Sequence, residues 1–278
     1  MLKLNEDNYY SKEADIDYMS VSQLKNFLPI APAKKPCEAR AVAELNGEYT
    51  RPQTDALTIG SYIDTKLTGT QEEFEAFKEA HPEIISSRGA TKGELKANFK
   101  IADEMVERAW KDRENGGIFL KALDGEKQKI FIGEIFGFPF KAKLDCLGDG
   151  YITDLKTTES INKRYYANGW YNFIDFWGYT FQGAIYQELV YQNTGKKLPF
   201  YIAAISKENN PDLGLFQIPQ ENLDIAMTYI DKDKLQRVQD LKNGTIAPQR
   251  CENCDYCRAT KVIKAPVDYN TIGDKNNE

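Results

Sequence analysis

The chain has 278 residues, 41% hydrophobic and 28% charged, so it can bury a substantial core without disulfides and is unlike a disordered protein. Its net charge of −6 argues against binding nucleic acid through overall positive charge alone. No apolar run approaches the ~20 residues of a membrane span, and the polar N-terminus predicts no secretory signal.

The first part of the chain is predicted to be helical after a polar, loosely packed lead-in over residues 1–18. Within SVSQLKNF, Ser22 can cap a helix whose apolar residues share one face. Prolines at 29, 32 and 36 then interrupt the chain before helical spacing resumes. Helices are predicted over residues 20–27, 37–45, 57–67, 71–80 and 94–111, with a loop over 86–93.

The centre of the chain has strand character instead. Strands are predicted over residues 129–135, 138–147, 151–157 and 199–206, and long helices over 180–191 and 223–243. This order predicts an α+β (mixed α/β) fold with a central mixed sheet flanked by helices. We expect one domain over residues 19–263, followed by a polar tail over 264–278.

Two carboxylates are predicted to meet across a hairpin. Asp149-Gly150 is a strong two-residue turn signal, because both positions tolerate positive φ. With that turn, Asp145 lies opposite Asp154, at a Cβ separation of about 4.5–5.5 Å. Lys156 projects from the same face, two residues beyond Asp154.

Paired acids at that distance repel each other unless a cation lies between them. A hard divalent cation such as Mg²⁺ prefers such oxygen ligands, and the lysine could orient water or stabilise phosphate charge. The alternative is an ordinary solvent-exposed ion pair between Asp154 and Lys156. We favour the metal site because the acids lie in otherwise apolar strands.

These residues resemble the PD-(D/E)xK nuclease signature, with Asp145 followed after a gap by Asp154-Leu155-Lys156 and with Leu144 in place of the proline. Gln182 and Tyr186 are similar to the Q-x-x-x-Y motif of the branch that includes lambda exonuclease and RecE-type enzymes. Four segments in order, SVSQLKNF, IGSYIDTKL, YITDLKTT and RCENCDYCRATK, resemble phage RecE-like exonucleases over about residues 18–263.

The resemblance implies roles for particular residues. Asp145, Asp154 and the Leu155 carbonyl would bind Mg²⁺ or Mn²⁺, and Lys156 would position the attacking water. Gln182 and Tyr186 would orient Lys156 or a DNA phosphate.

Two further acids are candidates by the same resemblance. Asp64 stands where many relatives have a histidine metal ligand, and its harder oxygen favours Mg²⁺. Glu134, on the preceding strand, is either a supporting acid behind the ligands or simply exposed.

Cysteines are clustered near the end of the chain. Cys251, Cys254 and Cys257 form C-x-x-C-x-x-C, and Cys37 lies far upstream. Four cysteines can hold either a [4Fe–4S] cluster or Zn²⁺, and the spacing alone does not separate the two. The resemblance implies the iron–sulfur cluster, in a structural role that joins the two ends of the domain.

Residues 165–191 are rich in aromatic side chains, most of which we expect in the core. The exceptions follow the catalytic strand closely and could contact DNA: Lys163, Arg164, Tyr165 and Tyr166.

The sequence therefore predicts a Mg²⁺-dependent exonuclease of phage recombination that acts on linear duplex or single-stranded DNA ends. The alternative is a catalytically weakened DNA-binding or scaffold protein on the same fold, which Asp64 keeps open. The resemblance implies a RecT-type annealing protein as partner and the cytoplasm of a bacterial host, with a phage or prophage gene. A homo-oligomer is possible in principle, and no membrane is expected.

Overall fold

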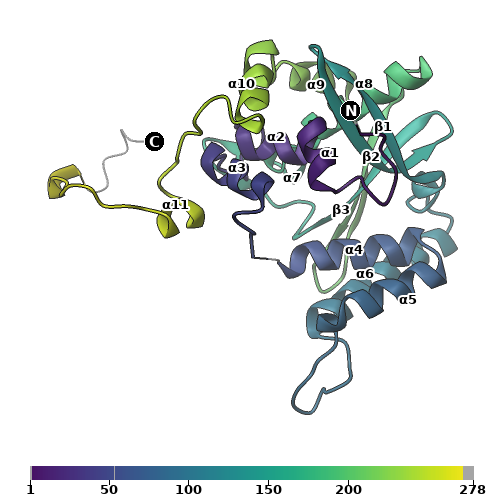
Figure 1. Ribbon diagram of the computed structural model, residues 1–278. Helices are drawn as coiled ribbons and strands as arrows, with labels where there is room; N and C mark the ends of the chain where they lie inside the picture. The colour runs from purple at the N-terminus through teal and green to yellow at the C-terminus, as the bar shows by residue number, and fades with distance from the viewer. Residues whose placement is uncertain (1, 53, 272–278) are drawn as a thin grey trace.

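The computed structural model describes residues 2–52 and 54–271 (Figure 1). The helices are α1 (Lys12–Asp17), α2 (Val21–Phe27), α3 (Glu38–Asn46), α4 (Asp55–Thr68), α5 (Gln71–Ala80), α6 (Ala97–Glu114), α7 (Phe173–Phe176), α8 (Tyr179–Thr194), α9 (Gln220–Met227), α10 (Lys232–Lys242) and α11 (Asp255–Ala259). The strands are β1 (Glu126–Ile135), β2 (Phe138–Gly148), β3 (Tyr151–Thr158), β4 (Tyr165–Tyr166), β5 (Trp170–Tyr171), β6 (Phe200–Ser206) and β7 (Leu213–Ile218).

A mixed sheet forms the centre of the fold, with strand order β1-β2-β3-β6-β7. Strands β3 and β6 are parallel, and the other neighbours in this sheet are antiparallel. A parallel pair needs a crossover, which here contains α8. The predicted α+β fold with a central mixed sheet is confirmed.

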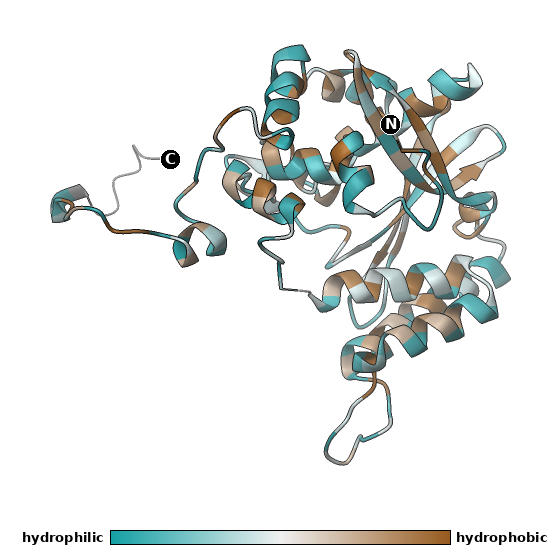
Figure 2. Ribbon diagram, in the orientation of Figure 1, coloured by the Kyte–Doolittle hydropathy of each residue, from teal (hydrophilic) through white to brown (hydrophobic). Residues whose placement is uncertain are grey.

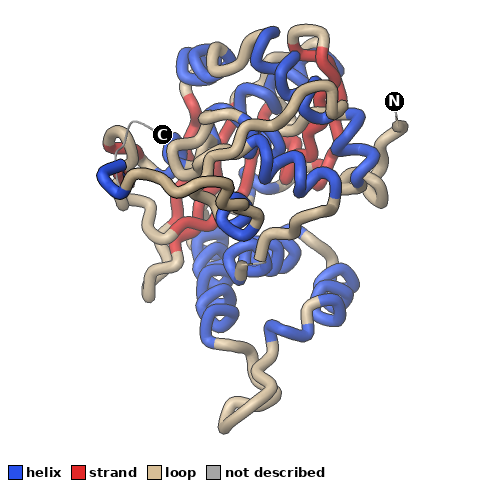
Figure 3. The backbone as a smooth tube through the Cα atoms, turned by 60° about the vertical axis from the view of Figure 1, so that its left-hand side comes forward, coloured by secondary structure: helices blue, strands red, loops and turns tan. Residues whose placement is uncertain are grey.

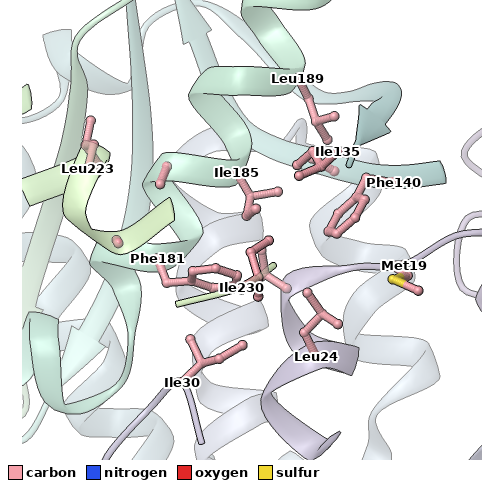
Figure 4. Close-up of a cluster of buried hydrophobic side chains, with 14 of the residues drawn as sticks. Met19, Leu24, Ile30, Ile135, Phe140, Phe181, Ile185, Leu189, Leu223 and Ile230 are labelled. Atoms are coloured by element: carbon pink, nitrogen blue, oxygen red, sulfur yellow. The ribbon is translucent and has the colours of Figure 1, made fainter. Parts of the chain in front are cut away.

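The sheet separates two hydrophobic cores, because side chains alternate between the faces of a strand. From β6, Phe200, Ile202 and Ala204 enter the core formed with α2, α8, α9 and α10. Figure 4 shows part of this core, with Leu24, Phe181 and Leu223 among the labelled side chains. Ala203 and Ile205 enter the second core, formed with α4 and α6. Figure 3 shows strands enclosed by helices, and in Figure 2 these helices alternate hydrophobic and hydrophilic segments.

The hairpin between β2 and β3 turns at Asp149-Gly150, as predicted, but of these two residues only Gly150 has a positive φ, 87°. The paired residues are Gly148 with Tyr151, Leu147 with Ile152, and Cys146 with Thr153. Pairing then stops, because β2 continues along β1 while β3 continues along β6 to Thr158. The predicted cross-strand pair of Asp145 and Asp154 is therefore not part of the ladder: both acids lie where the strands diverge.

Gly183 allows α8 to lie close to β6. A Cβ atom at this position would be 2.5 Å from Cδ1 of the buried Phe200 ring, closer than real side chains approach. The absence of that atom brings the neighbouring Gln182 toward β3.

The lead-in was expected to be loosely packed, and this prediction is wrong. Tyr9, Ala14 and Tyr18 are buried. The buried Lys141 donates to the Tyr9 carbonyl at 2.5 Å and pairs with Asp15 at 2.7 Å. The polar composition of the segment did not predict this packing. It depends on Lys141 of β2, which binds the carbonyl of Tyr9 and the carboxylate of Asp15.

The polar tail is described as far as residue 271, and residues 272–278 lie outside the described part of the chain. No helix in the described part is both long and apolar enough to cross a membrane.

Candidate active site

Asp154 is the most deeply buried acid of the site, with a side chain only 2% exposed. Its Oδ1 accepts a hydrogen bond from Nε2 of Gln182 at 2.7 Å, and its Oδ2 is in ion-pair contact with the Lys156 ammonium group. Gln182 therefore orients Asp154 directly, whereas the resemblance implied contact with Lys156 or a phosphate.

Asp145 spans the gap between the diverging strands. Its Oδ2 accepts the backbone N–H of Leu155 at 2.9 Å and lies 3.9 Å from Nζ of Lys156. The carboxylate of Asp145 on β2 thus accepts the Leu155 N–H of β3, which a backbone carbonyl would accept in a regular sheet. Lys156 contacts both acids, as the sequence predicted for the three side chains.

Asp64 approaches the same centre from α4. Its Oδ1 accepts from the Thr68 hydroxyl at 3.1 Å, and its Oδ2 accepts from Nε2 of Gln128 at 3.2 Å. Gln128 has a left-handed backbone, φ 50°, near the start of β1 and lies at the level of Asp145. Such conformations are rare for residues other than glycine and are concentrated at functional sites.

Gln128 was missed by the sequence analysis, because nothing in a polar residue of a strand announces a positive φ. Glu134, the acid considered on this strand, is exposed and lies opposite Pro139. Six residues separate it from Gln128, about 20 Å along a strand. The exposed alternative for Glu134 is therefore the correct one.

The acids of this site have raised pKa values. Burial and repulsion from Asp145 together raise the pKa of Asp154 to about 7 and the pKa of Asp64 to about 6. Burial alone would lower the pKa of Lys156, but attraction to Asp154 and Asp145 outweighs it and raises that pKa. Lys156 forms ion pairs with Asp154 and Asp145 but not with Asp64, so the three carboxyl groups are incompletely neutralised and their oxygens suit an additional hard cation.

Tyr179 lies between two lysines. Its ring centroid is 5.2 Å from Nζ of Lys156 and 5.3 Å from Nζ of Lys25. Both distances are within the range of cation–π attraction. The ring thus connects the acidic centre to α2, which the sequence analysis did not foresee.

A pocket of about 130 Å³ adjoins the acidic centre. Its wall consists of Tyr9, Ser20, Val21, Ser22, Lys25, Lys34, Lys141, Gln182 and Tyr186. Gln182 belongs both to this wall and to the hydrogen bond with Asp154. Tyr186 lines the pocket one helical turn further, so the two motif residues do share a face.

Lys25 and Lys34 of this pocket have lowered pKa values. Burial, with a smaller effect of Lys156, lowers the pKa of Lys25 to about 7, and burial also lowers that of Lys34. Lys25 donates to the carbonyl of Trp177 at 2.8 Å. Neither Lys25 nor Lys34 forms an ion pair with a carboxylate of the described residues, whereas the third pocket lysine, Lys141, pairs with Asp15. Two of the pocket lysines therefore lack a negative partner.

Comparison with known proteins places this arrangement in a family. Residues 20–260 match the model of the PDDEXK-like domain of unknown function (DUF3799). The chain therefore belongs to the PDDEXK-like family.

The crystal structure of a putative exonuclease from Eubacterium rectale is 38% identical, with a TM-score of 0.90 over 99% of this chain and 100% of that one. The crystal structure of SSO0001 covers 83% of this chain and 96% of its own, but with 12% identity and a TM-score of 0.31 it carries no argument. No curated protein matches the sequence. The predicted PD-(D/E)xK fold is confirmed, and the PDDEXK-like family supports a nuclease.

A small hairpin of β4 and β5 follows β3 in this PDDEXK-like core. Tyr166 and Trp170 are 67% and 65% exposed, with ring centroids 5.3 Å apart. Arg164 holds the hairpin by donating to the Trp170 carbonyl at 3.1 Å. Tyr165 instead stacks on Phe176 at 4.6 Å, so it anchors the hairpin.

Lys163, the fourth residue considered for DNA contact, is exposed and paired with Glu159 at 2.5 Å. Trp170 was not singled out from the sequence, because the pairing that places it beside Tyr166 depends on a two-residue strand. Within this hairpin, the exposed rings of Tyr166 and Trp170 present free aromatic surface.

The cysteine cluster lies outside the acidic centre of the PDDEXK-like core. The sulfur atoms of Cys37, Cys251, Cys254 and Cys257 all lie within 4.8 Å of one another. The predicted meeting of Cys37 with the C-terminal triplet is thus seen in the structure, and the four could hold a metal. The fifth cysteine, Cys146, lies instead in the second core.

Proposed function

We propose that this protein is a Mg²⁺-dependent exonuclease that degrades DNA from its ends. The proposal rests on two adjoining sites, one with excess negative charge and the other with excess positive charge. The acidic centre around Asp154 is short of a cation, and the pocket around Lys25 is short of an anion. A divalent metal and a phosphate group of DNA would satisfy both at once.

Asp145, Asp154 and Asp64 would hold the metal, with the Leu155 carbonyl as a further oxygen ligand. A bound Mg²⁺ or Mn²⁺ would supply Lewis-acid chemistry and an activated water. Lys156 keeps its proton because of its raised pKa, so it acts as a donor to water or to a phosphate oxygen and not as a base. Gln182 holds Asp154 in one orientation through a 2.7 Å hydrogen bond.

The pocket supports action at ends. Its volume of about 130 Å³ is smaller than the roughly 300–1,000 Å³ of ordinary small-molecule sites, but its lysines and hydroxyls suit one phosphate group. A terminal phosphate can enter such a pocket, whereas an internal phosphate carries chain on both sides. Tyr186 at the wall would position that phosphate.

The exposed rings of Tyr166 and Trp170 would stack on bases of a strand near the end. Arg164 and Lys163 add positive charge beside these rings. Tyr165 supports the hairpin from below by its stacking on Phe176.

We further propose the setting that the sequence resemblance implies: phage recombination in a bacterial cytoplasm, with a RecT-type annealing partner. The support is the order of the four RecE-like segments, three of which contribute residues to the acidic centre or the pocket. Homo-oligomerisation would raise processivity and is tested by sedimentation.

The deciding experiment compares end-labelled linear duplex with a covalently closed circle of the same sequence, each with Mg²⁺. We expect loss of nucleotides from the linear form and an intact circle. Cleavage of both forms at similar rates would show an endonuclease. End binding without any cleavage would instead support the alternative of a scaffold protein.

A second comparison tests the pocket. Lys25→Met should reduce the preference for a phosphorylated over a dephosphorylated end by roughly ten- to a hundredfold, since one charge-assisted hydrogen bond contributes about 1.5–3 kcal/mol. Lys197→Met is the control, because Lys197 pairs with Asp224 on the surface, away from the pocket. Equal preference in both variants would argue against phosphate recognition by Lys25.

A further inference from the structure

The four cysteines are already close enough to bind one metal atom. Sγ of Cys257 lies 3.6 Å from that of Cys37 and 4.0 Å from that of Cys251, and all four sulfur atoms lie within 4.8 Å of one another. In a tetrahedral site with metal–sulfur bonds of about 2.3 Å, neighbouring sulfur atoms are about 3.8 Å apart. The observed separations scatter around that value.

A [4Fe–4S] cluster requires a wider arrangement. Each cysteine then binds a different iron of a core of four irons and four sulfides, so the cysteine sulfur atoms are roughly 6 Å apart. No pair among the four reaches that separation, since the largest distance is 4.8 Å. The residues present therefore do not fit the cluster that the resemblance implies.

Backbone groups hold the sulfur atoms in this compact arrangement. Sγ of Cys251 accepts the N–H of Cys254 at 3.3 Å, and Sγ of Cys254 accepts the N–H of Cys257 at 3.4 Å. Each of these bonds lies within one C-x-x-C step. An N–H group that donates to sulfur favours the thiolate form over the thiol. Cys254 also caps α11, so opening this pair would disturb a helix end.

Cys37 is fixed separately from the C-terminal triplet. The neighbouring Glu38 accepts two hydrogen bonds from Arg237, at 2.7 and 2.9 Å, and one from the N–H of Gln249 at 2.8 Å. Ala39 donates to the Gln249 carbonyl at 3.0 Å. This network ties α3 to the segment just before Cys251, so widening the site would break several bonds at once.

We propose that Cys37, Cys251, Cys254 and Cys257 hold a single Zn²⁺ in a closed tetrahedral site, and no [4Fe–4S] cluster. Four thiolates leave no open position, which is the arrangement of structural zinc. The site thus fastens the C-terminal segment to α3 and takes no part in the chemistry.

The test is metal analysis of the full-length protein purified without oxygen and without added metal. We expect about one zinc per chain, no iron and a colourless solution. X-ray absorption at the zinc edge should show one shell of sulfur near 2.3 Å and no neighbouring metal. About four irons per chain with a brown colour, one iron per chain, or no metal would each overturn the proposal.

A pair of variants adds a control. Cys257→Ser should lower the zinc content at least tenfold, whereas Cys146→Ser should retain it, because Cys146 is buried in another core. Should Cys257→Ser fail to fold, the wild-type protein still decides: removal of zinc by a chelator and refilling with Co²⁺ should give the visible spectrum of tetrahedral cobalt thiolate. A spectrum of octahedral cobalt would contradict the four-sulfur site.

Discussion

Replacing Gly183 by alanine should displace α8 from the sheet. The added Cβ would lie 2.5 Å and 2.7 Å from two carbons of the Phe200 ring, which is fully buried and cannot move aside freely. Overpacking of this kind costs about 1–3 kcal/mol. Gln182 lies next to Gly183, and the Tyr186 ring contacts Phe200 edge to face at 6.3 Å, so both motif residues should shift as well.

Gly60 offers a matched control, because it also lies inside a helix but has open space where its Cβ would be. Alanine should gain about 1 kcal/mol of helix propensity at either position. The difference in unfolding free energy between the two variants then isolates the steric cost, about 1–3 kcal/mol.

Urea denaturation followed by circular dichroism measures this difference, and nuclease assays with Mg²⁺ measure the effect on chemistry. We expect Gly183→Ala to be the less stable variant and to lose at least tenfold in kcat through the displaced Gln182. Equal stability of Gly183→Ala and Gly60→Ala would refute the close approach of α8 to β6. A destabilised variant with unchanged kcat would refute the role of α8 in orienting the acidic centre.

Three further outcomes are expected. Asp154→Asn and Lys156→Met should each reduce cleavage by at least about a thousandfold, with the near-native circular dichroism of a folded protein, and near-wild-type rates in either would disprove the assignment of the centre. Apparent Mg²⁺ affinity, measured by titration calorimetry, should weaken as the pH falls from 8 to 6. The metal binds the deprotonated acids, and protons compete with it for Asp154, with a pKa of about 7, and for Asp64, with a pKa of about 6. An affinity that does not change with pH would contradict this prediction. Tyr166→Ala and Trp170→Ala should each weaken binding of DNA with a single-stranded end by about 1–3 kcal/mol in fluorescence anisotropy, and unchanged affinity in both would show that the hairpin does not contact DNA.

The part of the fold that follows from local chemistry could be predicted from the sequence. Asp149-Gly150 is a turn that few other dipeptides can make, and it determined the register of the hairpin as far as Cys146. The period of two then placed Asp154 and Lys156 together. Beyond Cys146, the course of β2 and β3 depends on which other strand each one pairs with, which no local signal specifies.

The remainder of the site depends on contacts between distant segments. Lys25 and Lys156 meet at Tyr179 although they come from different parts of the chain, and each would be an ordinary charged residue by itself. The left-handed backbone of Gln128 could not be predicted, because glutamine has no preference for a positive φ. Burial of the N-terminal segment depends on Lys141, a charged residue that is itself buried.

The joining of Cys37 to the C-terminal cysteines has a consequence for how the protein is destroyed. With a metal bound, the 215 residues from Cys37 to Cys251 form a closed ring that contains the whole acidic centre. An ATP-driven protease that engages the C-terminal tail meets this closure before it reaches any strand of the sheet. Degradation from that end would then have to extract the metal first, so the supply of the ion would set the lifetime of the nuclease in the cell.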